Sequence, residues 1–144
     1  MRVSDLIAGR QEVFCIADDT TVYDTARYLR EKQVRAVGVY SQAGKLVGVV
    51  SQMDISDKVA AENKCPAWMR VAEIMSTELV TVPPETPLDE CLQLMDKHHI
   101  FHLLVVDKKT GYRGTISDKD LLKVIATDEK ARGDLLEAFI FPQR

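Results

Sequence analysis

The pattern of apolar and polar positions repeats along the chain at a shift of 66 residues. Similar residues coincide at this shift: Thr20 with Thr86, Val22 with Leu88, Leu29 with Met95, Val34 with Ile100, Val39 with Val105, Gly48 with Gly114, Ser51 with Ser117 and Asp54 with Asp120. The register slips by one residue in the turn that holds Gly44, which matches Gly111, and then recovers. Self-similarity at a fixed period indicates two copies of one structural unit.

The segment before each copy repeats as well, but at a shift of 68 residues. Residues 3–6 (VSDL) resemble residues 71–74 (VAEI), so the first copy has a loop two residues longer, around Gly9, Arg10 and Gln11. We therefore predict three parts. Residues 1–66 form the first motif, 67–127 the second motif, and 128–144 a C-terminal helical tail.

Both copies predict the same order of elements: strand, helix, strand, strand, helix. In the first copy these are strand 13–16, a helix capped by Thr20 or Thr21, strands 35–40 and 46–50, and helix 52–62. In the second they are strand 79–82, a helix with Thr86 as its cap and Pro87 in its first position, strands 101–106 and 112–116, and helix 118–126. We predict an α+β fold of two β-α-β-β-α motifs packed around a pseudo-twofold axis, with an additional C-terminal helix.

Two segments lie outside the repeat. The linker, residues 63–69, carries Trp68 and Met69, which cover either the core or a partner surface. The tail, about 128–141, predicts a helix with apolar residues on one side: Leu135, Leu136, Phe139 and Ile140. This helix either folds back on its own module or packs on another chain.

Composition excludes several classes of protein. The chain has 144 residues, 46% of them hydrophobic, and a net charge of −3, which argues against binding to a nucleic-acid polymer. Its apolar runs are too short to cross a bilayer, and Asp5 interrupts the stretch that a signal peptide needs, so we expect a cytoplasmic protein. The three cysteines form no CxxC pair, which argues against both a disulfide framework and a cysteine zinc site.

Several strings in the two copies carry a family resemblance. The second copy reads IMS at 74–76, VTVP at 80–83, HI at 99–100, VVD at 105–107 and GTISDKD at 114–120, and the first reads GKLVGVVSQMD at 44–54. In this order, and repeated at one spacing, they resemble CBS domains, and the chain resembles a tandem CBS pair (a Bateman module) over about residues 3–62 and 71–126. It departs from the pattern at Gly38 and Leu104, where many CBS domains have proline.

In each copy a glycine is followed by a serine three residues later and by an aspartate three residues after that. On chemistry alone the pattern is a helix start, in which the serine caps and the carboxylate closes a capping box. It is also compatible with a nucleoside site, because a helix N-terminus attracts phosphate and a carboxylate accepts ribose hydroxyls. The resemblance implies this second role, with Asp54 and Asp120 on ribose and Ser51 and Ser117 at phosphate.

Other positions are candidates for base and phosphate contacts. An apolar slot for the base would use Ile16, Val37, Val82 and Leu103, with Val50 and Ile116 nearby, although all six also suit a plain core. Thr21 and Thr86 are either ligand contacts or helix caps. The resemblance implies a phosphate role for Arg35, whose counterpart is Phe101 with His102 beside it. A surface ion pair is the alternative for Arg35, stacking or packing for Phe101, and His102 would bind phosphate when protonated.

No catalytic or metal constellation emerges. His98, His99 and His102 cluster, but a strand is predicted to begin between His98 and His102, which removes the one-face geometry of a helical pair. The cysteines lie in apolar surroundings and are interpreted as buried small hydrophobes: Cys15, Cys65 and Cys91. We therefore expect neither an enzyme nor a metal protein.

The resemblance implies a regulatory module that binds adenosine-containing ligands in the cleft between the two CBS motifs. Candidate ligands are AMP, ADP, ATP, NAD and S-adenosylmethionine, with no obligatory cofactor. The alternative is a ligand-free module for dimerisation or protein interaction. In either case a homodimer is expected, with an effector protein that the sequence does not identify.

Overall fold

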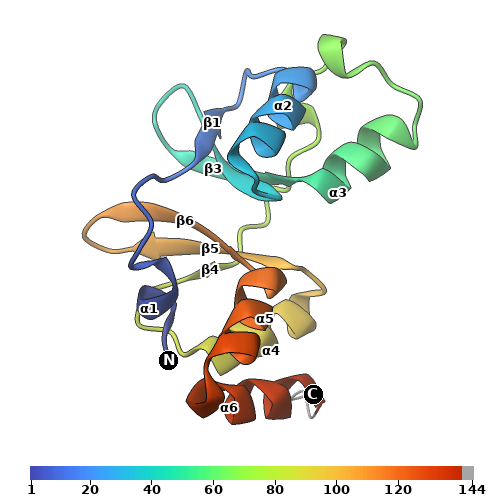
Figure 1. The fold of residues 1–144 in the computed structure, drawn as a ribbon. Coiled ribbons are helices and arrows are strands. Elements are labelled where there is room, and N and C mark those ends of the chain that lie inside the picture. The colour runs from blue at the N-terminus through green and yellow to red at the C-terminus, as the bar shows by residue number, and fades with distance from the viewer. Residues whose placement is uncertain (141–144) are drawn as a thin grey trace. The chain divides into compact units, whose positions relative to one another are not determined.

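The chain forms two compact units, described here for residues 1–140 from a computed structural model (Figure 1). The first unit is Val13–Leu79, and the second unit is Met1–Glu12 together with the chain from Val80 onwards. The twelve N-terminal residues therefore belong with the second sequence copy. The boundaries at 66 and 127 describe the repeat rather than these units, and they stay a prediction.

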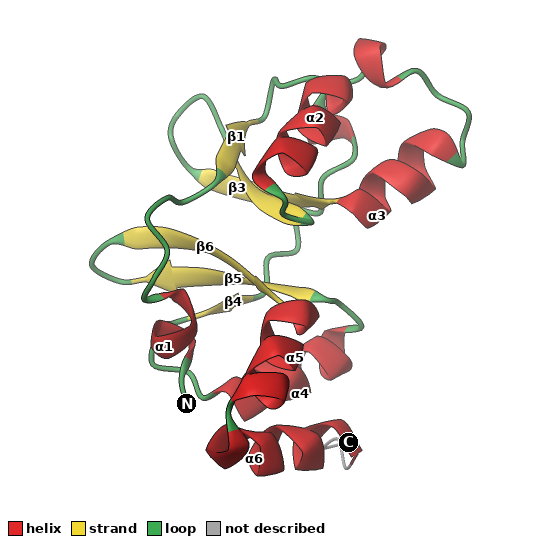
Figure 2. Cartoon of the chain, in the orientation of Figure 1, coloured by secondary structure: helices red, strands yellow, loops and turns green. Residues whose placement is uncertain are grey.

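The first unit is a three-stranded sheet with helices on one face (Figure 2). Strand β2 (Ala36–Tyr40) is central, parallel to β1 (Cys15–Ala17) and antiparallel to β3 (Leu46–Ser51). Helix α2 (Val22–Lys32) connects the parallel pair, as such a crossover requires. The core of the first unit is apolar and buried: Ile16, Val22, Leu29, Val37, Val39, Val50, Val59, Val71 and Ile74.

The second unit repeats this arrangement. Strand β5 (His102–Asp107) lies between β4 (Thr81–Val82), parallel, and β6 (Gly111–Ser117), antiparallel, while α4 (Leu88–His98) and α5 (Asp118–Thr127) cover one face. The hairpin glycines of the two units match, since Gly44 has φ +77° and Gly111 has φ +78°. Such values suit glycine, which explains why these positions align across the register slip. The predicted α+β fold is confirmed.

The segment before each sequence copy attaches to the unit of the other copy. Helix α1 (Val3–Ile7) belongs to the second unit, where the N–H of Val3 donates to the carbonyl of Thr86 (2.9 Å). A 3₁₀ turn, Val71–Glu73, belongs to the first unit, where the N–H of Val71 donates to the carbonyl of Thr20 (2.8 Å). Both valines are fully buried, so the 68-residue repeat marks two equivalent attachments.

The two equivalent helix starts differ in their caps. Thr21 caps α2, and its Oγ1 accepts the N–H of Asp24 (3.0 Å). The prediction that Thr86 caps α4 is wrong, because Pro87 is the N-cap residue and supplies no side-chain acceptor. The physical reason is the repeat itself, which aligns Pro87 with Thr21 and leaves Thr86 one residue too early.

The predicted helix 52–62 is not continuous α-helix. It consists of α3 (Gln52–Ile55) and a π-helical turn, Ser56–Ala60, in which the N–H of Ala61 donates to the carbonyl of Ser56 (2.8 Å). At the 66-residue shift Lys58 falls on Val124, a buried residue of α5. A π turn holds one extra residue, so Val59 takes the buried place that a lysine cannot fill.

Helix α6 (Glu129–Ile140) folds back on its own unit, against α4 and α5 (Figure 1). Leu135 is buried in the core of the second unit, and Nε of Arg132 donates to the carbonyl of Ile125 (2.8 Å). The side chains of Phe139 and Ile140, and residue 141, lie outside the described part of the chain. Within residues 1–140, no helix has the length and apolar character needed to cross a membrane.

Candidate functional site

In the first unit, a serine and an aspartate begin the helix that follows β3. Oγ of Ser51 accepts the N–H of Asp54 (3.2 Å), and Oδ2 of Asp54 accepts the N–H of Ser51 (2.9 Å). The Ser51 hydroxyl also donates to that Oδ2 (3.2 Å). The predicted capping box is confirmed, and it fixes a carboxylate at the strand-to-helix junction.

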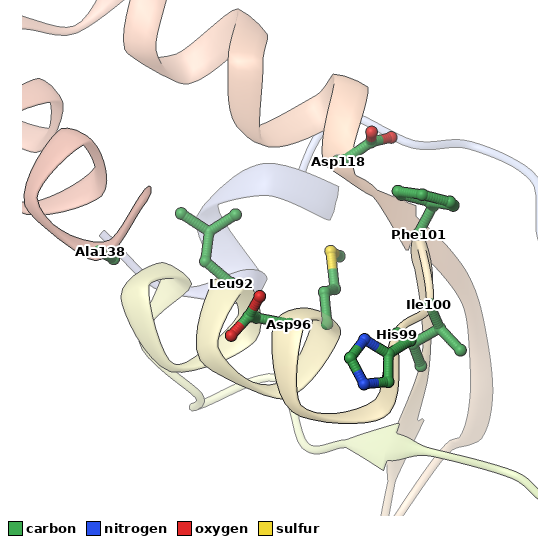
Figure 3. A pocket seen from close by; sticks show the side chains of 8 residues that line it. Leu92, Asp96, His99, Ile100, Phe101, Asp118 and Ala138 are labelled. Carbon is green, nitrogen blue, oxygen red and sulfur yellow. The ribbon is translucent and has the colours of Figure 1, made fainter. Parts of the chain in front are cut away.

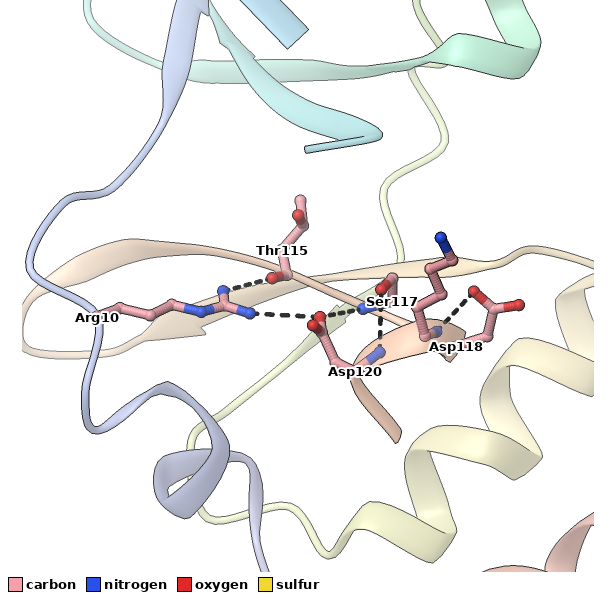
Figure 4. Close-up of polar contacts among 6 residues, drawn as sticks. Arg10, Thr115, Ser117, Asp118 and Asp120 are labelled. Atoms are coloured by element: carbon pink, nitrogen blue, oxygen red, sulfur yellow. Dashed lines mark hydrogen bonds and ion pairs between the residues drawn. The ribbon is translucent and has the colours of Figure 1, made fainter. Parts of the chain in front are cut away.

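The second unit has the same junction between β6 and α5 (Figure 4). Oδ2 of Asp120 accepts the N–H of Ser117 (2.9 Å), and Oγ of Ser117 accepts the N–H of Asp120 (3.3 Å). The adjacent N–H of Lys119 donates to Oδ1 of Asp118 (2.8 Å). Both sequence copies therefore hold one aspartate in the same local geometry.

A different cationic side chain lies beside the aspartate in each unit, and neither is among the site residues predicted from the sequence. Nζ of Lys58 lies 3.1 Å from Oδ1 of Asp54 and donates to the carbonyl of Ile74 (2.8 Å). Nη2 of Arg10 lies 3.3 Å from Oδ2 of Asp120. Lys58 could have been found from its i,i+4 spacing to Asp54, whereas Arg10 is 110 residues away from its partner.

The predicted phosphate residues lie beside these junctions. Arg35 is exposed, its carbonyl accepts the N–H of Gln52 (2.9 Å), and no described residue bonds to its guanidinium. Phe101 takes the equivalent place, with its carbonyl accepting the N–H of Asp118 (3.1 Å). His102 is partly buried and pairs with Ser117 across the sheet. The structure therefore brings Arg35 next to one capping box and His102 next to the other.

The apolar candidates for a base slot are core residues in this structure. The following side chains are at most 8% exposed: Ile16, Val37, Val50, Val82, Leu103 and Ile116. A base could contact only their backbone without rearrangement of the core. Thr21 caps α2 through its hydroxyl, as Ser51 caps α3, whereas Thr86 is buried.

A pocket of about 290 Å³ opens in the second unit, where α4 ends, β5 begins and α6 passes (Figure 3). Its lining is mostly apolar with three polar side chains: Leu92, Met95, Asp96, His99, Ile100, Phe101, Asp118 and Ala138. The ring of Phe101 forms one side and is half exposed. Neither Ser117 nor Asp120 lines this pocket, so Phe101 faces a different place from the capping box.

The remaining candidates for chemistry are dispersed. His98 ends α4 and His102 begins β5, as predicted, and within residues 1–140 no group of three or more His, Cys, Asp or Glu side chains is placed to hold a metal. The prediction that all cysteines are buried is wrong for two of them. Cys15 and Cys65 are exposed, because β1 alternates and points Ile16 inwards while Cys65 lies in the linker. Burial raises the pKa of the Cys91 thiol to about 12, with help from Glu90 and Asp89.

Comparison with known proteins defines the family. The family model for the CBS domain matches residues 3–61 and 71–127, so this chain belongs to the CBS-domain family and carries two such motifs. The solved structure of a protein with CBS domains from Burkholderia ambifaria is 28% identical, with a TM-score of 0.82 over 90% of this chain and 96% of that one. A CBS domain protein from Pyrobaculum aerophilum, complexed with AMP, shares the fold at 21% identity, with a TM-score of 0.80 over 96% and 100% of the two chains.

Among curated relatives, an uncharacterised protein of Methanocaldococcus jannaschii is 33% identical over 111 residues. The match covers 76% of this chain but only 59% of that relative. This chain therefore spans less than two thirds of that relative, which contains further sequence.

Proposed function

We propose that this chain is a regulatory module that binds adenosine-containing ligands through the Ser51–Asp54 and Ser117–Asp120 junctions. The observation that carries the proposal is the repetition of one geometry, in which a helix start presents a serine and a fixed carboxylate in both units. The AMP complex of a protein with the same fold supports a nucleotide as the ligand. AMP, ADP, ATP, NAD and S-adenosylmethionine are the candidates.

The chemistry of each junction suits a nucleoside with a phosphate. The N–H groups at a helix start and the positive end of its dipole favour an anion. A carboxylate accepts hydrogen bonds from ribose hydroxyls, and these are strengthened by its charge. Arg35 adds a permanent cation next to Ser51, whereas His102 near Ser117 binds an anion best when protonated. We therefore propose two sites with unequal affinity for phosphate.

A thermal-shift panel tests this function. A nucleotide at a hundred times its dissociation constant should stabilise the protein by about 2.7 kcal/mol. Asp54→Ala and Asp120→Ala combined should abolish the shift, whereas Asp57→Ala, an exposed acid outside the capping box, should retain it. No shift with any of the five ligands at millimolar concentration would disprove the sensor function.

A second candidate function is an interaction module, and Trp68 favours it. Trp68 is 86% exposed in the linker turn Pro66–Trp68, and tryptophan is a residue type that is enriched in protein interfaces. We propose a homodimer in the cytoplasm that signals to an effector protein and has no catalytic activity of its own. Light scattering measures the mass of the full chain and of Trp68→Ser, and a monomer in both would contradict the dimer. Incubation with ATP should yield no product.

A further inference from the structure

We propose that Arg10 determines ligand specificity at the second motif: its guanidinium holds Asp120 until a ligand arrives, then pairs with the anionic group of that ligand. This inference rests on the proposed function and adds a selectivity that the two motifs do not share. It assigns a role to the loop in which the two sequence copies differ by two residues.

The guanidinium of Arg10 lies between a backbone carbonyl of β6 and the carboxylate of Asp120. Nη1 of Arg10 donates to the carbonyl of Thr115 (2.6 Å), and Nη2 lies 3.3 Å from Oδ2 of Asp120 (Figure 4). In the first unit the equivalent carbonyl, that of Val49, accepts a backbone N–H from Ser76 instead (2.8 Å). A movable side chain in the second unit thus replaces a fixed backbone donor in the first.

The carboxylate of Asp120 has few acceptor positions left for a ligand. A carboxylate oxygen accepts about two hydrogen bonds, and Oδ2 of Asp120 already receives the N–H of Ser117 and the guanidinium of Arg10. Within the described chain Oδ1 receives none, so one ribose hydroxyl fits there directly. The second hydroxyl needs Oδ2, and it must displace Arg10.

Arg10 lies in an exposed loop and is free to move. Residues 8–12 are all exposed, and one-third of the Arg10 side chain is accessible (34%). Both side chains of this ion pair are partly accessible to solvent (34% and 27%), and ion pairs near the surface are weak, so the release of Asp120 costs little. A released guanidinium is always charged and binds phosphate through two parallel hydrogen bonds. An adenosine ligand with a 5′-phosphate therefore restores a partner to Arg10, whereas uncharged adenosine leaves it without one.

Isothermal titration of the full chain in an Asp54→Ala background isolates the second motif. In that background the ratio of AMP affinity to adenosine affinity should fall about tenfold or more on Arg10→Ala, because a charged contact is lost for AMP only. Arg10→Lys should retain part of the preference, since it keeps the charge but loses the planar fork. Arg113→Gln removes one exposed charge from β6, outside this cluster, and should leave the ratio unchanged.

The outcomes are separable. An unchanged ratio in Arg10→Ala, or an equal fall in Arg113→Gln, overturns the role of Arg10 while the nucleotide site stands. Binding of neither AMP nor adenosine in the Asp54→Ala background overturns the proposed function at this motif, and the specificity role with it. A fall confined to Arg10→Ala, larger than in Arg10→Lys, supports the proposal.

Discussion

Gly48 lies so close to Met75 that a Cβ atom built on the glycine would be 2.9 Å from Cγ of the methionine and closer still to its sulfur. The backbone carbonyl oxygen of Ser76 would be 3.1 Å from the added Cβ atom. We predict that Gly48→Ala lowers the free energy of unfolding by about 1–3 kcal/mol through overpacking. Urea denaturation of Gly48→Ala, Met75→Ala and the double variant measures this. The double variant should be more stable than the sum of the two losses predicts, and strict additivity would contradict the contact.

Gly114 occupies the equivalent position of the second motif but is required for a different reason. Its φ is +105°, a conformation that side chains disfavour, while the nearest atom to an added Cβ is Nη1 of Arg10 at 3.4 Å. Gly114→Ala should therefore lose about 1–2 kcal/mol through backbone strain. The matched test is the double variant with Arg10→Ala, which should give no rescue. A rescue as large as that of Gly48→Ala by Met75→Ala would show a steric cause instead.

The capping boxes contribute to stability independently of any ligand. Ser51→Ala or Ser117→Ala leaves the N–H of the aspartate three residues later without its side-chain acceptor. Each should lower the free energy of unfolding by about 1 kcal/mol in the absence of nucleotide. Ser56→Ala is the control, since this exposed serine lies one turn later and caps nothing with its side chain. Equal losses of unfolding free energy in Ser56→Ala and Ser51→Ala would contradict the capping role of Ser51.

The thiols should differ in reactivity. Burial raises the pKa of Cys91 to about 12, so its thiol stays protonated at pH 8, whereas Cys15 and Cys65 are exposed. We predict that a thiol reagent labels two cysteines in the native protein and a third only after unfolding in urea. Rapid native labelling of all three would contradict the burial of Cys91.

The same pKa shift makes stability depend on pH at its alkaline end. The folded state keeps the Cys91 proton above pH 9, where the unfolded state loses it, so the free energy of unfolding falls as pH rises from about 9 towards 12. The slope is at most about 1.4 kcal/mol per pH unit for one group. Comparison with Cys91→Ala between pH 8 and 10.5 isolates this contribution, and identical slopes would contradict it.

Local patterns predicted much of the fold and the capping boxes. The order of elements followed from the apolar pattern of each copy. The turn glycines matched across a one-residue slip in the repeat, because Gly44 and Gly111 need the same backbone conformation. The Ser-x-x-Asp spacing predicted both helix starts, since the hydrogen bonds of a capping box join residues only three apart. Each of these features is determined by residues that are near in sequence.

Features that depend on residues far apart in sequence, or on a break in the helical period, could not be predicted in this way. The pairing of Arg10 with Asp120 joins residues 110 positions apart, and a side chain in a loop gives no periodic signal. The π turn after α3 depends on the fit of Val59 rather than Lys58 into the core, which a helical period of 3.6 does not describe. Cys15 is exposed, contrary to the prediction, because its strand alternates every second residue and the apolar run at 13–16 conceals that alternation.

Helix α6 should be an integral part of the second unit, and two adjacent leucines test this. Leu135 is 2% exposed and belongs to the core with residues of α4 and α5, whereas Leu136 is 40% exposed. Leu135→Ala should lower the free energy of unfolding by about 2–4 kcal/mol, because it removes a buried side chain and leaves a cavity. Leu136→Ala makes the same chemical change on the same helix, and its loss should stay below about 1 kcal/mol. Chemical denaturation measures both, and equal small losses would show that α6 is not held in this core.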